Sequence, residues 1–150
     1  MNSELRRMLV VDDDPADREM IMNVLESQPG LSGRVDLAHD GAEALDYVYR
    51  RGAFSQRSFL DPKVILLDLK MPRVDGLEVL RAVKGDPLCR HIPIVTFTAS
   101  EEERDIRQCY ALGANGFLIK HMRPADFRAG VEDFAHYWFL QNRTLSVPPA

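Results

Sequence analysis

The chain has 150 residues, and 45% of them are apolar, which suits one domain with its own hydrophobic core. Its 19 basic and 23 acidic residues give a net charge of -4, so it lacks the basic surplus typical of a nucleic-acid-binding protein. There is no run of about 18 apolar residues, and the start of the chain lacks the apolar stretch of a signal peptide. We therefore expect a cytoplasmic protein that binds neither membrane nor nucleic acid.

Short apolar segments alternate with helical patterns along the chain. The predicted strands lie at 8–11, 35–38, 64–67, within 92–98 and at 116–119. The predicted helices begin near Pro15, Gly41, Gly76 and Ser100, and the last one covers 124–141. Five strand–helix units of this kind predict an α/β domain with a five-stranded parallel sheet between two helix layers, a three-layer doubly wound (βα)5 arrangement. We expect the domain to cover 1–142 and the tail, 143–150, to be frayed.

Local signals mark several helix ends. Asp14 stands directly before Pro15, a pairing typical of an N-cap and a first helical residue. Ser100 and Glu103 have the spacing of a capping box, which predicts the start of the fourth helix. Gly113 is predicted to end that helix. The two cysteines of the chain have no second pair to complete a zinc site, which predicts reduced and partly buried thiols.

Chemically active side chains follow the predicted strands. In a doubly wound sheet, the residues just after the strands meet at one edge, where such folds bind their ligands. The groups at the strand ends are Asp12, Asp13 and Asp14 after the first strand, Asp68 after the third, Thr98 on the fourth and Lys120 after the fifth. The sequence therefore brings carboxylates, a hydroxyl and an ammonium group to one edge of the sheet.

These groups suit phosphoryl chemistry with a divalent cation. Carboxylates that lie close together repel one another unless a cation compensates their charge, and Mg²⁺ prefers a few carboxylates together with waters and phosphate oxygens. Lys120 and Thr98 are able to bind phosphoryl oxygens, and Asp68 is the best candidate for a nucleophile because carboxylates form acyl phosphates. Asp14 is interpreted as a helix cap only.

Four motifs together carry a resemblance to a known family. They are V-V-D-D-D-P at 10–15, L-L-D-L-K-M-P-R-V-D-G at 66–76, V-T-F-T-A-S at 95–100 and L-G-A-N-G-F-L-I-K at 112–120. With them the chain resembles, over about residues 5–140, the flavodoxin-like receiver domain of two-component response regulators. The resemblance implies a phosphoacceptor rather than an enzyme, able to use small phosphoryl donors and to lose its phosphoryl group again.

The resemblance also implies a role for each matching residue. Asp68 would accept a phosphoryl group from a histidine kinase. Asp12, Asp13, Asp68 and the backbone carbonyl of Lys70 would bind Mg²⁺, or another divalent cation such as Mn²⁺ or Ca²⁺.

A second set of residues would form the switch. Thr98, next to the small Ala99, would move toward the phosphoryl group, Lys120 would bind that group, and Phe117 would turn inward. The change would alter the face made by the fourth helix, the fifth strand and the last helix.

The expected partners are proteins. Only about nine residues follow the last predicted helix, too few for a DNA-binding domain, so we expect a downstream protein target. The aromatic residues 137–139 predict a homodimer through the last helix. The long loop after the second helix and the motif at 66–76 are similar to the subgroup that partners bacterial phytochrome kinases.

One residue departs from the family pattern. The proline that usually follows the phosphate-binding lysine, often through a cis peptide bond, is replaced here by His121. A cis bond without proline costs about 3–4 kcal/mol, so the bond between Lys120 and His121 is predicted to be trans.

Three other readings compete with the receiver. A receiver-like module without phosphorylation is supported only by His121. An aspartate-nucleophile phosphohydrolase would use an acid of the first strand as nucleophile, but the chain has no room for a substrate-binding cap. A flavodoxin-like mononucleotide binder would need a Ser/Thr/Gly-rich phosphate loop after the first strand, where this sequence is acidic.

Overall fold

The computed structural model describes residues 6–58 and 60–149, so the first five residues of the predicted domain lie outside the described residues. Within these ranges one parallel sheet contains β1 (Met8–Val11), β2 (Val35–Ala38), β3 (Val64–Leu67), β4 (Ile94–Thr98) and β5 (Gly116–Ile119). The helices are α2 (Pro15–Glu26), α3 (Gly41–Tyr49), α4 (Gly76–Lys84), α5 (Glu103–Ala111) and α6 (Pro124–Phe134). None of the helices described here has both the length and the apolar character that a membrane crossing requires.

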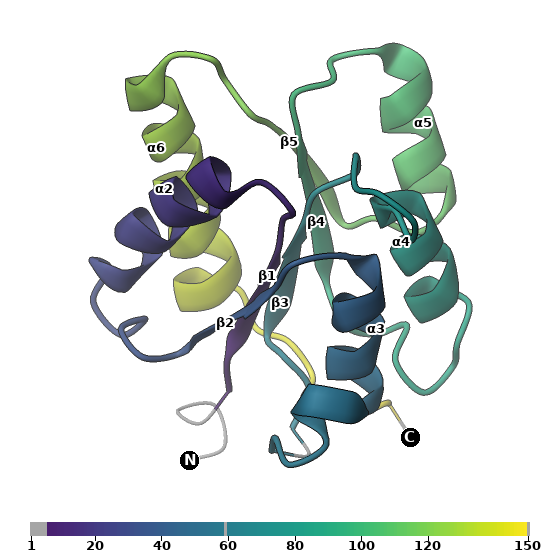
Figure 1. Cartoon of the computed structure of the whole chain (residues 1–150). Helices are drawn as coiled ribbons and strands as arrows, with labels where there is room; N and C mark the ends of the chain where they lie inside the picture. Colours follow the sequence, from purple (N-terminus) through teal and green to yellow (C-terminus); the bar gives the residue numbers. More distant parts are fainter. Residues whose placement is uncertain (1–5, 59, 150) are drawn as a thin grey trace.

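The sheet has the strand order β2-β1-β3-β4-β5. Helices α2 and α6 cover one face, and α3, α4 and α5 cover the other (Figure 1). The central strands β1 and β3 are buried along their whole length because helices cover both of their faces. The predicted three-layer, doubly wound fold of the flavodoxin-like type is therefore confirmed. The order of strands reverses between β1 and β3, which makes the carboxyl ends of these two strands the expected place for a ligand.

Aspartate side chains cap three of the helices. Asp14 accepts a hydrogen bond from the backbone N–H of Asp17, as predicted, and Asp40 and Asp75 cap α3 and α4 in the same way. Each cap satisfies one of the free N–H groups of the first turn and fixes the position at which the helix leaves the sheet edge.

The capping box predicted for α5 is wrong. The residue before the helix is Glu102, and it makes no side-chain cap. Ser100 lies in the turn after β4, two residues before the N-cap, and is too far from the helix to cap it. Its hydroxyl instead donates a hydrogen bond to the carboxylate of Asp105 at 2.5 Å. Gly113 ends the helix as predicted, with a φ of 103° directly after the last cap residue. The thiols of Cys89 and Cys109 are free and buried.

The last helix changes its winding. The helix continues to Gln141 as predicted, but its α-helical part ends at Phe134 and a π-helical segment, Ala135–Gln141, follows. Phe134 and Phe139 are five residues apart, and each is 2% exposed. Hydrogen bonding from residue i to i+5 puts side chains at this spacing on the same side of the helix, so both rings pack into the core.

Residues 144–146 of the tail contact the base of the sheet, so the prediction of a frayed tail is wrong for this part of it. Arg6, which is 3% exposed, donates hydrogen bonds from its guanidinium group to the carbonyl oxygens of Asp61, Pro62, Thr144 and Leu145. The backbone N–H of Asp61 also donates to the carbonyl of Ser146 at 3.2 Å. These contacts could not be predicted because they depend on one buried side chain that meets irregular segments outside the strands and helices.

Candidate functional site

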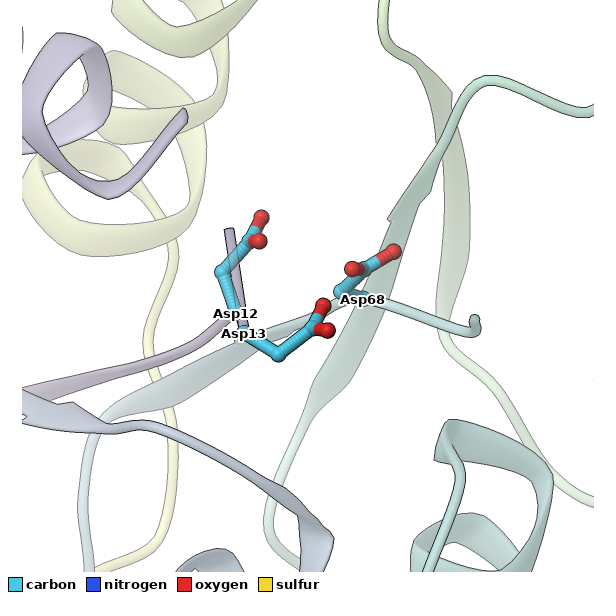
Figure 2. Close-up of side chains that lie close together, drawn as sticks. All are labelled: Asp12, Asp13 and Asp68. Carbon is cyan, nitrogen blue, oxygen red and sulfur yellow. The ribbon is translucent and has the colours of Figure 1, made fainter. Parts of the chain in front are cut away.

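Three carboxylates meet at the carboxyl ends of β1 and β3. The two strands are paired with Val11 opposite Leu67, so the residues that follow them, Asp12 and Asp68, are neighbours. One oxygen from each of Asp12, Asp13 and Asp68 lies within 4.8 Å of the others. Figure 2 shows the three side chains reaching into the same space. Asp12 and Asp68 are only 1% and 6% exposed, and Asp13 lies further out.

The burial of these acids makes their charges costly. Burial, followed by repulsion from Asp12 and Asp13, raises the pKa of Asp68 to about 7, although Lys120 and the backbone N–H of Lys70 act in the opposite direction. Burial also raises the pKa of Asp12. A hard divalent cation with oxygen ligands would offset this cost, so the charge and the donor atoms of the cluster suit such a cation.

Lys120 lies against the same carboxylates. Its backbone N–H donates to the carbonyl of Thr98 at 2.7 Å, which fixes the start of its side chain beside the end of β4. Its Nζ lies 2.7 Å from Asp12 Oδ2, 2.9 Å from Asp17 Oδ2 and 3.5 Å from Asp68 Oδ2. Burial alone would lower the pKa of Lys120, but the three carboxylates outweigh it and raise that pKa overall. The ammonium group is therefore charged and directed at the acidic cluster.

Thr98 and Phe117 lie on one side of the sheet. Thr98 is 1% exposed, and its Oγ1 accepts a hydrogen bond from the backbone N–H of Ser100 at 3.3 Å. Phe117 is half-buried and is paired with Thr96, two residues before Thr98. Because side chains alternate along a strand, both threonines and Phe117 face α3, α4 and α5. Thr98 thus stands between the acidic cluster and the predicted switch aromatic.

An open pocket of about 630 Å³ is lined by Asp68, Thr98 and Lys120, among other residues. Ala99 and Lys70 are exposed on its wall. The full lining consists of Asp13, Asp14, Asp17, Asp68, Lys70, Thr98, Ala99, Ser100, Glu101, Glu102, Asp105 and Lys120. Seven carboxylic acids face only two lysines there, so the pocket attracts cations and repels extended polyanions.

Sequence reasoning missed Asp17 and the pair of Ser100 with Asp105. Asp17 lies in the first turn of α2, the helix that begins directly after the predicted acids of the first strand. Its closeness in sequence to Asp12 and Asp13 was a usable signal. The contact between Ser100 and Asp105 had no such signal because it depends on where α5 begins.

The bond between Lys120 and His121 is trans, as predicted, since the described residues contain no cis peptide bond. His121 itself is exposed and lines a separate, smaller pocket. Although His121 stands where the family usually has proline, the ammonium group of Lys120 still lies at the acidic cluster.

Comparison with known proteins agrees with this geometry. The family model of the response regulator receiver domain matches residues 8–132 of this chain. The chain belongs to this family, whose members act in two-component signalling.

Two curated relatives have similar lengths. The probable methanogenesis regulatory protein FilR2 of Methanothrix harundinacea is 38% identical over 137 residues, which is 91% of this chain and 86% of the relative. The response regulator Rcp1 of Synechocystis is 30% identical over 143 residues, which is 95% of this chain and 93% of Rcp1.

Solved structures of response regulators are also similar to this chain. The phosphorylated cyanobacterial phytochrome response regulator RcpA is 30% identical, with a TM-score of 0.85 over 96% of this chain and 99% of RcpA. The Mn²⁺-bound form of Rcp1 is 29% identical, with the same TM-score over 97% of this chain and 99% of Rcp1. The bacteriophytochrome response regulator AtBRR is 45% identical, with a TM-score of 0.72 over 89% of this chain and 95% of AtBRR.

Proposed function

We propose that this receiver domain accepts a phosphoryl group on Asp68 from a histidine kinase, with Mg²⁺ or a similar divalent cation at the acidic cluster. The observation that carries the proposal is the position of Asp68. Its carboxylate belongs to the three-acid cluster and also lies 3.5 Å from the ammonium group of Lys120. A nucleophile in this position has a cation site on one side and a fixed positive charge on the other.

The reaction would proceed at the carboxylate oxygen of Asp68. This oxygen forms a bond to the donor phosphorus while the bond between phosphorus and the histidine nitrogen breaks, and the released imidazole nitrogen takes up a proton. Asp12, Asp13 and the carbonyl of Lys70 would bind the cation. When bound, the cation supplies positive charge that offsets the charge of the phosphoryl oxygens. Lys120 would donate hydrogen bonds to one of these oxygens.

The phosphoryl group would then act on Thr98 and Phe117. It adds about -1.5 to -2 charges and three strong acceptor oxygens at Asp68. Thr98 would turn its hydroxyl from the Ser100 turn toward the phosphoryl group, and the half-buried Phe117 would move into the space on that side of the sheet. The result would be a changed surface at α5, β5 and α6.

The proposed kinase partner is a bacterial phytochrome kinase. This is supported by the phytochrome association in the descriptions of RcpA and AtBRR, which match nearly the whole chain. The output would be contact with a downstream protein and with a second copy of the chain. Tyr137 and Leu140, which are 53% and 40% exposed on the π-helical segment, are available for such a homodimer. A monomeric mass in sedimentation at high protein concentration would remove the dimer from the account.

Phosphorylation can be tested without the kinase. The intact protein is incubated with phosphoramidate in the presence of Mg²⁺ or of EDTA, and its mass is measured. We expect one phosphoryl adduct that needs both Mg²⁺ and Asp68, and no adduct on Asp68→Asn. Repeated turnover of a generic phosphate ester would favour the phosphohydrolase, and an unlabelled wild-type protein would favour an interaction module without phosphorylation.

A further inference from the structure

We propose that Asp17 is a positioning residue for Lys120. It keeps the ammonium group at the site when Asp12 binds the cation and Asp68 carries the phosphoryl group. The inference rests on the proposed function, because it concerns how Lys120 would meet the phosphoryl group. It assigns a role to an acid that lies outside the three-carboxylate cluster.

Lys120 has three carboxylate partners, and only two of them belong to the cation cluster. Asp12 and Asp68 lie in the cation cluster, whereas Asp17 does not. Asp17 Oδ2 nevertheless lies 2.9 Å from Lys120 Nζ and accepts a hydrogen bond from it. In the described part of the chain, Asp17 is therefore the one carboxylate partner of this ammonium group that a cation at the cluster would leave unoccupied; its other neighbour there, the ring of Phe97 at 5.7 Å, carries no charge.

The charges at the site make such a partner necessary. A divalent cation bound by Asp12 would weaken the attraction between Asp12 and Lys120, and it would itself repel the ammonium group over a few ångströms. Once Asp68 carries a phosphoryl group, its free carboxylate charge is also gone. Asp17 would then be the carboxylate whose attraction for Lys120 still offsets the repulsion between the cation and the ammonium group.

The backbone around Asp17 is fixed independently of Lys120. Its N–H donates to Asp14 Oδ2 at 3.2 Å, within the N-cap of α2. The next residue, Arg18, donates from its guanidinium group to the carbonyl of Asp12 at 2.9 Å. The N-terminal turn of a helix also stabilises a negative charge. Asp17 is thus a charged and well-held acceptor on a rigid element.

The structure also offers a place for Lys120 to go if Asp17 is lost. A second pocket of about 250 Å³ shares Asp17 with the acidic pocket and is lined in part by Met20, His121 and Phe127. Lys120 lines both this pocket and the acidic pocket. Without the carboxylate of Asp17, a bound cation would push the ammonium group toward the second pocket and away from the phosphoryl group.

The test compares two substitutions that remove the same charge from the same helix turn. Asp17→Asn removes the partner of Lys120. Asp14→Asn is the matched control, because it retains a good N-cap and Asp14 is not among the carboxylates that pair with Lys120 in the described structure. At saturating Mg²⁺, we expect Asp17→Asn to slow phosphoramidate labelling by about tenfold, the order expected for a lost charged hydrogen bond. Asp14→Asn should stay within about twofold of the wild-type rate, and Asp17→Glu should recover part of the loss.

A second set of variants shows whether Asp17 acts through Lys120. In a Lys120→Met background, Asp17→Asn should cause no further loss of rate. An equal loss in both backgrounds, or equal rates for Asp17→Asn and Asp14→Asn, would overturn the inference.

The inference can also be separated from the proposed function by NMR without any phosphoryl donor. In the Mg²⁺-bound protein, the ¹⁵N signal of the Lys120 ammonium group, assigned with Lys120→Met, should show slow proton exchange in the wild type and in Asp14→Asn. It should show fast exchange in Asp17→Asn. Slow exchange in Asp17→Asn would overturn the inference even if Asp68 is labelled, whereas an unlabelled wild-type protein with the expected exchange would overturn only the proposed function.

Discussion

Lys120 and Asp12 form a buried ion pair that joins the ends of β5 and β1, with 2.7 Å between Nζ and Oδ2. The two residues are 108 positions apart in the chain. Their side chains are 9% and 1% exposed, so water screens the pair only weakly. Because Asp12 also belongs to the three-acid cluster, the ammonium group and a divalent cation bound there would compete for the same carboxylate.

Removal of this competitor should strengthen cation binding. We expect Lys120→Met to raise the affinity for Mg²⁺ by about tenfold, since a positive charge next to two cluster carboxylates is lost. The same variant should be labelled more slowly because the phosphoryl oxygens lose a donor. Calorimetric titration with Mg²⁺ in the absence of a phosphoryl donor measures the affinity. An unchanged or weaker affinity would show that Lys120 does not compete with the cation.

The raised pKa of Asp68 predicts a stability that depends on pH in the absence of a divalent cation. Burial first, and then the neighbouring acids, raise this pKa to about 7 from the ordinary aspartate value of 3.8. The folded protein therefore binds more protons at Asp68 than the unfolded chain does between these values, so stability falls as the pH rises through this range. The cost is fully present above pH 7 and is relieved as the pH falls toward 4.

Asp68→Asn removes that cost. In EDTA at pH 8, this variant should be more stable than the wild type by about 2–4 kcal/mol, and the difference should shrink at pH 5. Urea unfolding at the two pH values measures it. Added Mg²⁺ should stabilise the wild type more than the variant. A difference in EDTA that is independent of pH would contradict the assigned pKa.

The guanidinium group of Arg6 should be a major source of stability at the base of the sheet. Arg6→Ala would leave the carbonyl oxygens of residues 61, 62, 144 and 145 without their buried donor, which should cost about 3 kcal/mol. Arg7→Ala is the neighbouring control: it breaks an ion pair with Asp36 whose side chains are 39% and 25% exposed, and it should cost about 1 kcal/mol or less. Urea unfolding measures the free energy of unfolding of both variants. A loss for Arg6→Ala that is no larger than the loss for Arg7→Ala would contradict the prediction.

Gly76 sets how closely α4 approaches the phosphoacceptor segment. A Cβ atom on Gly76 would lie 2.4 Å from the carbonyl oxygen of Asp68 and 2.7 Å from Cα of Leu69, so the backbone would have to shift. Gly76→Ala should destabilise the protein by about 1–3 kcal/mol and slow the labelling of Asp68. Gly130→Ala in α6 is the control, because its Cβ would meet nothing within 4 Å, and it should be neutral or slightly stabilising. Unfolding and labelling of both variants check the prediction.

The fold and the centre of the site were predictable from the sequence for the same reason. Apolar strands that alternate with helices define a parallel sheet, and the residue that follows each strand then has a fixed place on its edge. Asp12, Asp68 and Lys120 could be placed together in this way although none of them is close in sequence to the others. Their measured distances agree with that expectation.

The errors concern contacts that carry no periodic signal. The attachment of the tail to Arg6 depends on one buried side chain that meets a distant loop, and a proline-containing end gives no hint of it. The π-helical winding of Ala135–Gln141 follows from the packing of Phe134 and Phe139 rather than from local preference. The hydrogen bond of Asp17 to Lys120 was missed because charged residues in a first helical turn are usually solvated.

The position of the phosphoryl group in the chain is the decisive measurement for Asp68 as the nucleophile. Protein labelled with phosphoramidate and Mg²⁺ is treated with borohydride, which reduces an aspartyl phosphate to homoserine, and its peptides are sequenced by mass spectrometry. If Asp68 is the phosphoacceptor, we expect homoserine at position 68 and unchanged aspartate at positions 12 and 13. Homoserine at position 12 or 13 would contradict it, because the nucleophile would then follow β1, as in the competing phosphohydrolase.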